Sequence, residues 1–313
     1  MIPGTFMMDF AGNNELSDRI TQTLYLADRR GYGLSLAHIS MFLYCGEARE
    51  EEIRKELSTM TGISHCNDVY CLKGREHLLG ETCRRLHNNG TMNGRYEAIA
   101  RHFASEFASF CPFIECIAIA GSIASDGFSE EDDVDFNIVV KSGCKYTVYL
   151  LGILISIKYA FRYRNKPLAR RAATPFLPKL ICINVIWEDW EALPYARQDK
   201  FLAYEILRQK PIFGTKFYSD ILVKNRWLET YFPQIYMKRY YDVKCKKTIF
   251  GSLILLLYAN STASYLGERF CKMISYFLWR AVQFSRRNNK EAIDRVRWVT
   301  EMQRPYALFG DRI

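Results

Sequence analysis

Two short stretches decide the fold, Ile117-Ala118-Ile119-Ala120-Gly121-Ser122 and, after a gap of ten residues, Asp133-Val134-Asp135-Phe136. An apolar run typical of a strand ends at a glycine, and a second apolar run begins with two carboxylates. Successive side chains of a strand alternate between its faces, so Asp133 and Asp135 project from the same face. The pattern predicts two strands that place a glycine turn beside an acidic pair.

This arrangement suits a site for a nucleoside triphosphate and its metal ions. Gly121 has no Cβ, so it tolerates positive φ and lets a phosphate approach the backbone. Ser122 adds a hydroxyl and a backbone N–H where a helix is expected to begin, which favours anion binding. Two adjacent carboxylates repel each other unless a cation lies between them, and Mg2+ binds through one or two carboxylates plus phosphates. The alternative is a glycine turn followed by a solvated acidic loop, Glu130-Glu131-Asp132.

Further segments extend the two strands into a small mixed sheet flanked by helices, which makes the expected fold class α+β. The patterns predict strands at 114–120, 133–140 and 180–187, a turn with a short helix at 121–130, and an apolar helix at 145–160. Before this sheet, residues 76–110 predict one or two helices broken near Asn88-Asn89-Gly90. We therefore expect a central domain over residues 76–195.

Residues 1–75 predict a winged-helix segment of three helices and a hairpin. Ser35 is placed to cap one helix, and residues 48–60 form a second helix with Ile53 and Leu57 on one face. The segment is either a nucleic-acid reader or a module for packing and protein contacts. Four glutamates in residues 48–60 disfavour entry of that helix into a phosphate-lined groove.

Residues 196–313 have a helical pattern throughout and predict a C-terminal helical domain. Two apolar stretches, Tyr146 to Ile157 and Thr248 to Ala259, are shorter than the roughly 18–20 residues that a membrane span needs. We expect both to be buried helices. No basic start followed by an apolar core is seen in the N-terminal residues, so a soluble cytoplasmic protein without a membrane partner is the expectation.

The composition is that of an ordinary globular protein, with 49% hydrophobic and 25% charged residues, which argues against disorder. A formal net charge of +9 is compatible with a nucleotide, RNA or another polyanion as partner. The ten cysteines contain no CxxC pair, so a zinc site of common spacing is not indicated. Several cysteines, such as Cys182, lie in apolar runs, where cysteine behaves as a small hydrophobe.

The Gly121-Ser122 turn and the Asp133-Val134-Asp135-Phe136 stretch together resemble the signature of the polymerase-β-like nucleotidyltransferase superfamily. The resemblance covers residues 113–190. It implies that Gly121 and Ser122 hold the triphosphate, that Asp133 and Asp135 are catalytic and bind two Mg2+ ions, and that the substrate is an NTP.

The wider order of elements resembles a group of prokaryotic nucleotidyltransferase-domain proteins that begin with a winged-helix segment. This likeness covers most of the chain, but its phrases are much less specific than the central motif. They are Leu72-Lys73-Gly74-Arg75-Glu76, Ile181-Cys182-Ile183-Asn184, Tyr204-Glu205-Ile206, Gln209-Lys210-Pro211-Ile212-Phe213, Asn225-Arg226-Trp227 and Tyr231-Phe232-Pro233.

One departure from the superfamily pattern concerns the third acid that active members carry on a later strand. The strand expected at 180–187 offers Asn184 there, which can contribute a carbonyl oxygen to the cofactor site but cannot act as a base at neutral pH. Glu188 and Asp189 follow at the strand end. The third role is therefore filled from elsewhere, or is dispensable, or is missing from a protein that binds nucleotide without efficient transfer.

Seven cations occur between residues 158 and 179 without an intervening acid, and they are either a solvated surface or contacts for a triphosphate or polyanionic acceptor. They are Lys158, Arg162, Arg164, Lys166, Arg170, Arg171 and Lys179.

The leading hypothesis is a Mg2+-dependent nucleotidyltransferase. It would move a nucleoside monophosphate from an NTP to a hydroxyl of a small-molecule, protein or RNA acceptor. The competing hypothesis is a catalytically weak or inactive nucleotide sensor that regulates through nucleic acid, and Asn184 is the residue that favours it.

Overall fold

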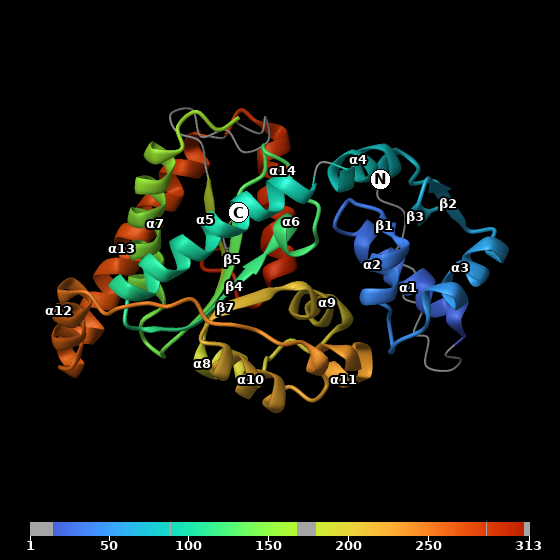
Figure 1. The fold of residues 1–313 in the computed structure, drawn as a ribbon. Coiled ribbons are helices and arrows are strands. Elements are labelled where there is room, and N and C mark those ends of the chain that lie inside the picture. Colours follow the sequence, from blue (N-terminus) through green and yellow to red (C-terminus); the bar gives the residue numbers. More distant parts are fainter. Residues whose placement is uncertain (1–14, 88, 168–179, 286, 310–313) are drawn as a thin grey trace. The chain divides into compact units, whose positions relative to one another are not determined.

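The computed structural model describes residues 15–309 except 88, 168–179 and 286 (Figure 1). It is a mixed α+β structure with two small sheets. The chain divides into two compact units. The first consists of residues 1–84 and 229–235, and the second consists of residues 85–228 and 236–313.

Three helices lie wholly within the first unit, together with a three-stranded antiparallel sheet in the order β1-β3-β2. These elements are α1 (Leu16–Asp28), β1 (Leu34–Ser35), α2 (Leu36–Met41), α3 (Glu50–Thr59), β2 (Ile63–Cys66) and β3 (Val69–Leu72).

Local sequence explains where these elements begin and turn. The Ser35 hydroxyl caps α2 by accepting a hydrogen bond from the His38 backbone N–H at 3.3 Å. Asn67 adopts a φ of +53° between β2 and β3, a conformation that asparagine tolerates in tight turns. Ile53 and Leu57 are buried on one face of α3, as their spacing predicts.

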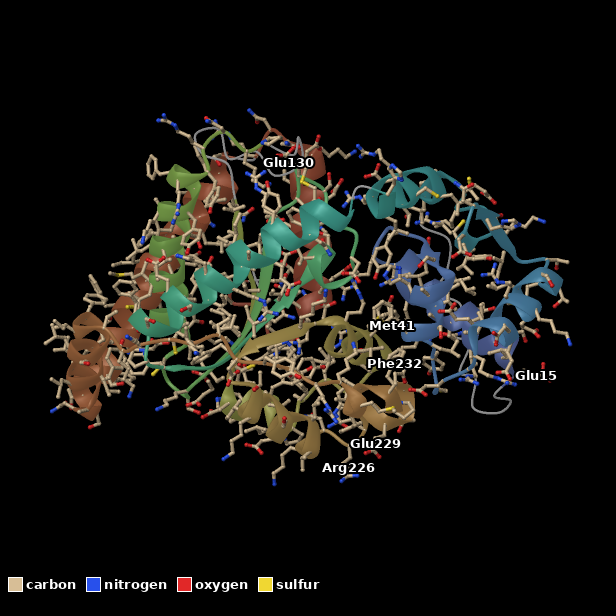
Figure 2. All side chains as sticks on the ribbon, viewed as in Figure 1. Glu15, Met41, Glu130, Arg226, Glu229 and Phe232 are labelled. Atoms are coloured by element: carbon tan, nitrogen blue, oxygen red, sulfur yellow. The ribbon has the colours of Figure 1, made fainter. Side chains whose placement is uncertain are left out.

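A short segment far along the sequence completes the first unit. The Gln234 side chain donates a hydrogen bond to the Leu43 carbonyl at 2.8 Å, and the Phe232 ring meets the Tyr44 ring edge-on at 5.8 Å. Phe232, labelled in Figure 2, is fully buried. The N-terminal core therefore depends on residues that the sequence places in the C-terminal region.

The second unit is built around a four-stranded sheet in the order β6-β5-β4-β7. Its strands are β4 (Ile114–Ala120), β5 (Val134–Val140), β6 (Ile181–Glu188) and β7 (Lys210–Phe213). β4 is antiparallel to β5 and β7, whereas β5 and β6 are parallel, so a crossover must join them. Helix α7 (Lys145–Arg162) lies in that crossover.

β7 corrects the sequence prediction, which assigned residues beyond 196 to helices. The four residues Lys210–Phe213 pair with β4 at the edge of the sheet. Pro211 is compatible with this position because an edge strand leaves one side of its backbone without ladder partners. So short a strand has too few residues to show an alternating pattern, and the helical pattern around it dominated.

One face of the sheet is apolar and packs against helices. Phe136, Ile138 and Val140 of β5 are fully buried in a core shared with α5 (Asn89–Phe110). The Phe103 ring stacks on Phe136 with centroids 4.9 Å apart. Asp135 and Asn137 alternate with these residues, so they face the other side of the sheet.

The other helices belong to the second unit, except α4, α11 and η1, which lie mostly in the first (Figure 1). They are α4 (His77–His87), α6 (Gly121–Ala124), α8 (Asp189–Ala192), α9 (Lys200–Arg208), α10 (Thr215–Lys224), α11 (Leu228–Tyr231), η1 (Pro233–Met237), α12 (Ile249–Tyr258), α13 (Ser261–Ser285) and α14 (Lys290–Gln303).

In the described residues, no single helix has the length and apolar character to cross a bilayer. α12 and α13 pass that test only as a pair, and they are bent by 112° relative to each other. The expectation that Thr248 to Ala259 is a buried helix is wrong, because Ile249 is 84% and Leu256 is 70% exposed. Helix α7 is buried on one side, where Val148 lies, and exposed at Leu154.

Candidate functional site

The two aspartates of the motif lie together with a cysteine at one end of the central sheet. One ligand atom each from Asp133, Asp135 and Cys182 lie within 4.8 Å of one another, and all three residues are half-buried. Asp133 precedes β5 and Asp135 lies within it, whereas Cys182 lies on β6. The sheet therefore brings together the two predicted metal ligands and adds a thiol that was not predicted.

Parallel pairing of β5 with β6 explains the position of the thiol. Asp135 is the register partner of Cys182, and the pairs Val134–Ile181 and Phe136–Ile183 hold this register on both sides. Neighbouring strands lie about 4.8 Å apart, so register partners have adjacent side chains on the same face. Cys182 is thus fixed beside Asp135 by the backbone.

Gly121 is required at its position for two reasons. Its φ is +64°, and a Cβ there would lie only 2.2 Å from Oδ2 of Asp135. Ala120, the residue before it, is the register partner of Asp135 across β4 and β5. The space beside this glycine, expected to admit a phosphate, is taken by the Asp135 carboxylate. A glycine at position 121 therefore allows the Asp135 carboxylate to take this position.

Helix α6, which begins at Gly121, ends at Ala124 and is shorter than the expected turn and helix at 121–130. Ser125 closes it by donating from its hydroxyl to the Gly121 carbonyl at 3.1 Å. The Gly127 backbone N–H donates to the Ser122 carbonyl at 3.0 Å. These bonds hold Ser122, which is half-exposed, in a compact turn after β4.

Asn184 lies in a hydrogen-bonded network farther along the same face. Its amide donates to Oδ1 of Asn137 at 3.1 Å, and its Oδ1 accepts from Nε2 of Gln303 at 2.9 Å. The register of β5 and β6 shifts after Phe136 and Ile183, so β6 has one extra residue at Asn184. Such a bulge re-aims a side chain. The sheet thus places Asn184 beside Asn137, and its role in nucleotide binding stays a prediction.

The network continues into the interior of the unit. Asn137 donates to Oε1 of Gln209 at 3.0 Å, and Gln209 donates to the Tyr218 hydroxyl at 3.2 Å. Tyr218 in turn donates to the Ile206 carbonyl at 3.1 Å. Asn137 and Gln209 are at most 3% exposed, so their amides depend on these neighbouring side chains for hydrogen bonding.

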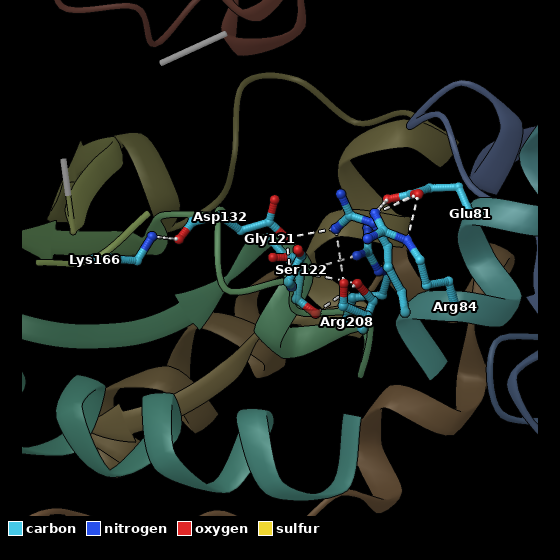
Figure 3. Close-up of polar contacts among 11 residues, drawn as sticks. Glu81, Arg84, Gly121, Ser122, Asp132, Lys166 and Arg208 are labelled. Carbon is cyan, nitrogen blue, oxygen red and sulfur yellow. Dashed lines mark hydrogen bonds and ion pairs between the residues drawn. The ribbon is translucent and has the colours of Figure 1, made fainter. Parts of the chain in front are cut away.

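Three cations gather near the Gly121 turn. Arg208, which is 5% exposed, donates from Nη2 to the Gly121 carbonyl at 3.2 Å (Figure 3). Lys210 forms an ion pair with Asp126 at 3.1 Å. Lys238 donates to the Leu207 carbonyl, and burial, together with the charges of Lys210 and Arg208, lowers its pKa to about 8. Arg208, Lys210 and Lys238 thus place positive charge close to the turn, where it would attract an anionic ligand.

The acidic loop before Asp133 is held by two cations rather than being simply solvated. Arg85 donates from Nη1 to Oδ2 of Asp132 at 2.6 Å and to the Gly127 carbonyl at 3.0 Å. Lys166 donates to the Asp132 carbonyl at 2.5 Å (Figure 3). Burial lowers the pKa of Lys166, and the charge of Asp133 opposes that shift.

Other cations of the run between residues 158 and 179 make contacts elsewhere or lie outside the described residues. Lys158 pairs with Glu106, and the Arg162 guanidinium lies 5.8 Å from the Tyr163 ring centroid. Arg170, Arg171 and Lys179 lie outside the described residues. Lys166 is a member of the run that reaches the acidic loop.

The residues at the site fit a divalent cation. Two carboxylates on one face supply the hard oxygen ligands that Mg2+ uses alongside phosphate oxygens. The thiol of Cys182 adds a softer ligand of the kind that Zn2+ accepts together with carboxylates. The glycine opposite leaves room for the Asp135 carboxylate, where any Cβ would displace it.

Cys182, Arg208, Lys210 and Lys238 were not predicted as parts of this site. Cys182 lies in an apolar run, a pattern that predicts a core residue. The three cations are scattered through a region of helical pattern. The only available signal for Cys182 was the pairing register of 133–140 with 180–187, which a single sequence does not provide.

Comparisons of this chain with protein-family models, curated proteins and solved structures find no match.

Proposed function

We propose that the second unit is a Mg2+-dependent nucleotidyltransferase that moves a nucleoside monophosphate from an NTP to a hydroxyl of a small-molecule, protein or RNA acceptor. The observation that carries the proposal is the convergence of Asp133 and Asp135 at the Gly121 turn, with Arg208 beside that turn. Acidic ligands next to buried cations suit a bound metal–triphosphate complex, which has charges of both signs.

Each predicted residue has a role in this proposal. Asp133 and Asp135 hold the metal ions, and Gly121 and Ser122 lie next to the triphosphate. Asn184 would contact the nucleotide through its carbonyl oxygen. The two Mg2+ ions would supply the charge stabilisation that phosphoryl transfer requires.

The proposed reaction exchanges one P–O bond for another. The acceptor hydroxyl oxygen bonds to the α-phosphorus of the NTP, and the bond from that phosphorus to the bridging oxygen breaks, which releases pyrophosphate. The hydroxyl proton passes to solvent, because neither a thiol nor the Asn184 amide replaces the third carboxylate well as a base. Slow transfer is the expected consequence.

A second candidate function is a nucleotide sensor that acts through nucleic acid, and the thiol in place of a third carboxylate favours it. Among the described residues, the group that contains Asp133 and Asp135 is completed by a thiol rather than by a carboxylate. The first unit would then serve as a winged-helix module. Its helix α3 begins with Glu50, Glu51 and Glu52, so contact with nucleic acid would use another surface.

Pyrophosphate release from each of the four NTPs, with Mg2+ and candidate acceptors, tests the proposal. Replacing both aspartates (Asp133→Asn with Asp135→Asn) should abolish release, whereas Asp220→Asn, an exposed aspartate on α10, should leave it unchanged. Pyrophosphate release that persists in the double variant would contradict the assignment of the site to these two aspartates. NTP-dependent thermal stabilisation, without pyrophosphate release from the NTP in the presence of any acceptor, supports the sensor instead.

A further inference from the structure

We propose that Cys182 is the third protein ligand of the metal site and that its thiolate makes the site select Zn2+ over Mg2+. This inference rests on the proposed function only in taking Asp133 and Asp135 as metal ligands. It replaces Mg2+ by Zn2+ as the metal that the same proposed reaction would use at these ligands, and it names a residue that sequence reasoning assigned to the core.

Backbone pairing, rather than a chance side-chain orientation, places the thiol. Three consecutive register pairs, from Val134–Ile181 to Phe136–Ile183, keep Cys182 opposite Asp135, and the bulge begins only after them. On β6, Ile181 is buried, whereas Cys182 is half-exposed and lies on the same face as Asn184. Cys182 therefore lies on the same side of the sheet as Asp135.

Ligand chemistry decides between the two metals. Mg2+ takes oxygen ligands and near-ideal octahedral geometry. Zn2+ accepts cysteine sulfur and aspartate oxygen together, and its catalytic sites commonly use three protein ligands with one open position. A set of two carboxylates and one thiolate matches the second description. The open position would face the substrate side of the site.

The spacing requires only a small adjustment. At a tetrahedral centre, Zn–S and Zn–O bonds of about 2.3 and 2.1 Å hold two ligand atoms of one ion roughly 3.4–3.6 Å apart. The three atoms lie within 4.8 Å of one another, so side-chain rotations that move them by less than about 1 Å bring them into range.

Titration of the metal-free full-length chain with Co2+, a spectroscopic probe for zinc sites, tests this directly. A thiolate ligand gives a sulfur-to-cobalt charge-transfer band in the near ultraviolet. The band should appear in the wild type and in Cys245→Ser, which removes an exposed thiol of the same unit, and should vanish in Cys182→Ser. Circular dichroism of each variant verifies that it is folded.

Competition by Zn2+ and Mg2+ provides the second measurement. In Cys182→Ser, Zn2+ affinity should fall at least about tenfold, since even outer-shell changes at metal sites have effects of that size. Cys182→Asp, which supplies a hard ligand, should bind Mg2+ more tightly than the wild type does. A charge-transfer band that persists in Cys182→Ser, or bound Co2+ with no such band in the wild type, overturns the inference.

The two proposals fail in different ways. Mg2+-supported pyrophosphate release that is unchanged in Cys182→Ser, with no thiolate band in the wild type, removes the role of Cys182 and leaves the transferase intact. A thiolate band in the wild type without pyrophosphate release under any metal supports the Cys182 ligand and removes the transferase.

Discussion

The Asp135 carboxylate fills the space that a side chain at Gly121 would need, because its Oδ2 lies 2.2 Å from the position that a Cβ on Gly121 would take. The glycine directly follows Ala120, the last residue of β4, and Ala120 is the register partner of Asp135 on β5. A side chain at position 121 and an aspartate rotamer suited to the metal site therefore exclude each other.

Gly121→Ala should consequently weaken metal binding as well as stability. Alanine at a φ of +64° costs roughly 1–2 kcal/mol of backbone strain, and its methyl group displaces the Asp135 carboxylate. Calorimetric metal titration and urea unfolding measure the two effects separately.

Gly143→Ala is the matched control for this prediction. Gly143 has a φ of +71°, but a Cβ there meets no atom within 4 Å. It should lose a similar amount of stability and retain full metal affinity. Wild-type metal affinity in Gly121→Ala would show that Asp135 is not constrained as described.

Lys238 should make stability depend on pH in the alkaline range. Burial and the neighbouring cations lower its pKa from 10.5 to about 8 in the folded state. Between these values the unfolded chain binds a proton that the folded chain does not, so the free energy of unfolding rises with pH. The cost of burying the charge is fully present below pH 8 and is relieved above it.

Lys238→Met should remove this pH-dependent contribution to the free energy of unfolding. The difference in that free energy between the wild type and the variant should therefore change between pH 8 and pH 10.5 and stay constant outside this range. Urea titrations across the range measure it. Lys224→Met, at an exposed lysine of α10, should leave the pH profile of the wild type unchanged. A flat difference for Lys238→Met contradicts the lowered pKa.

The buried amide pair Asn137 and Gln209 should behave as one unit in a double-mutant cycle. Removing either side chain leaves one polar atom of the other amide, Nδ2 of Asn137 or Oε1 of Gln209, without this partner, at a cost of about 1–3 kcal/mol. We expect Asn137→Leu and Gln209→Leu together to cost less than the sum of the single changes. Urea unfolding of the four proteins measures the coupling, and additive losses would contradict the network.

Arg85 should control the shape of the acidic loop that leads into Asp133. Its ion pair with Asp132 is about a quarter exposed, and it also binds the Gly127 carbonyl. Arg85→Met should reduce metal affinity by loosening the loop. Arg101→Met, which breaks the more exposed pair with Glu97 on α5, should leave metal affinity as it was. If Arg85→Met and Arg101→Met changed the metal affinity equally, this role of Arg85 would be contradicted.

The sequence was a good guide where a residue pattern acts locally. Strands β4, β5 and β6 fall within about a residue of the predicted ranges 114–120, 133–140 and 180–187. Alternation within one strand also placed Asp133 and Asp135 on the same side. Both inferences needed only nearest-neighbour geometry.

Features that depend on how distant segments align were beyond the sequence. The choice between Cys182 and Asn184 beside Asp135 depends on a parallel register and on one bulge. β7 and the cations Arg208 and Lys238 reach the site only through tertiary packing. Likewise, nothing local in the pattern shows that α12 keeps its leucines exposed.

The central sheet also has a consequence for how this protein is made. Strand β4 gains its second neighbour only when Lys210 has been synthesised, because Lys210 pairs with Ile119. Until then, a chain emerging from the ribosome presents an open strand edge and an Asn137 amide that still lacks Gln209. Non-local pairing of this kind slows folding, so the second unit should fold late and should benefit from chaperones that shield β4.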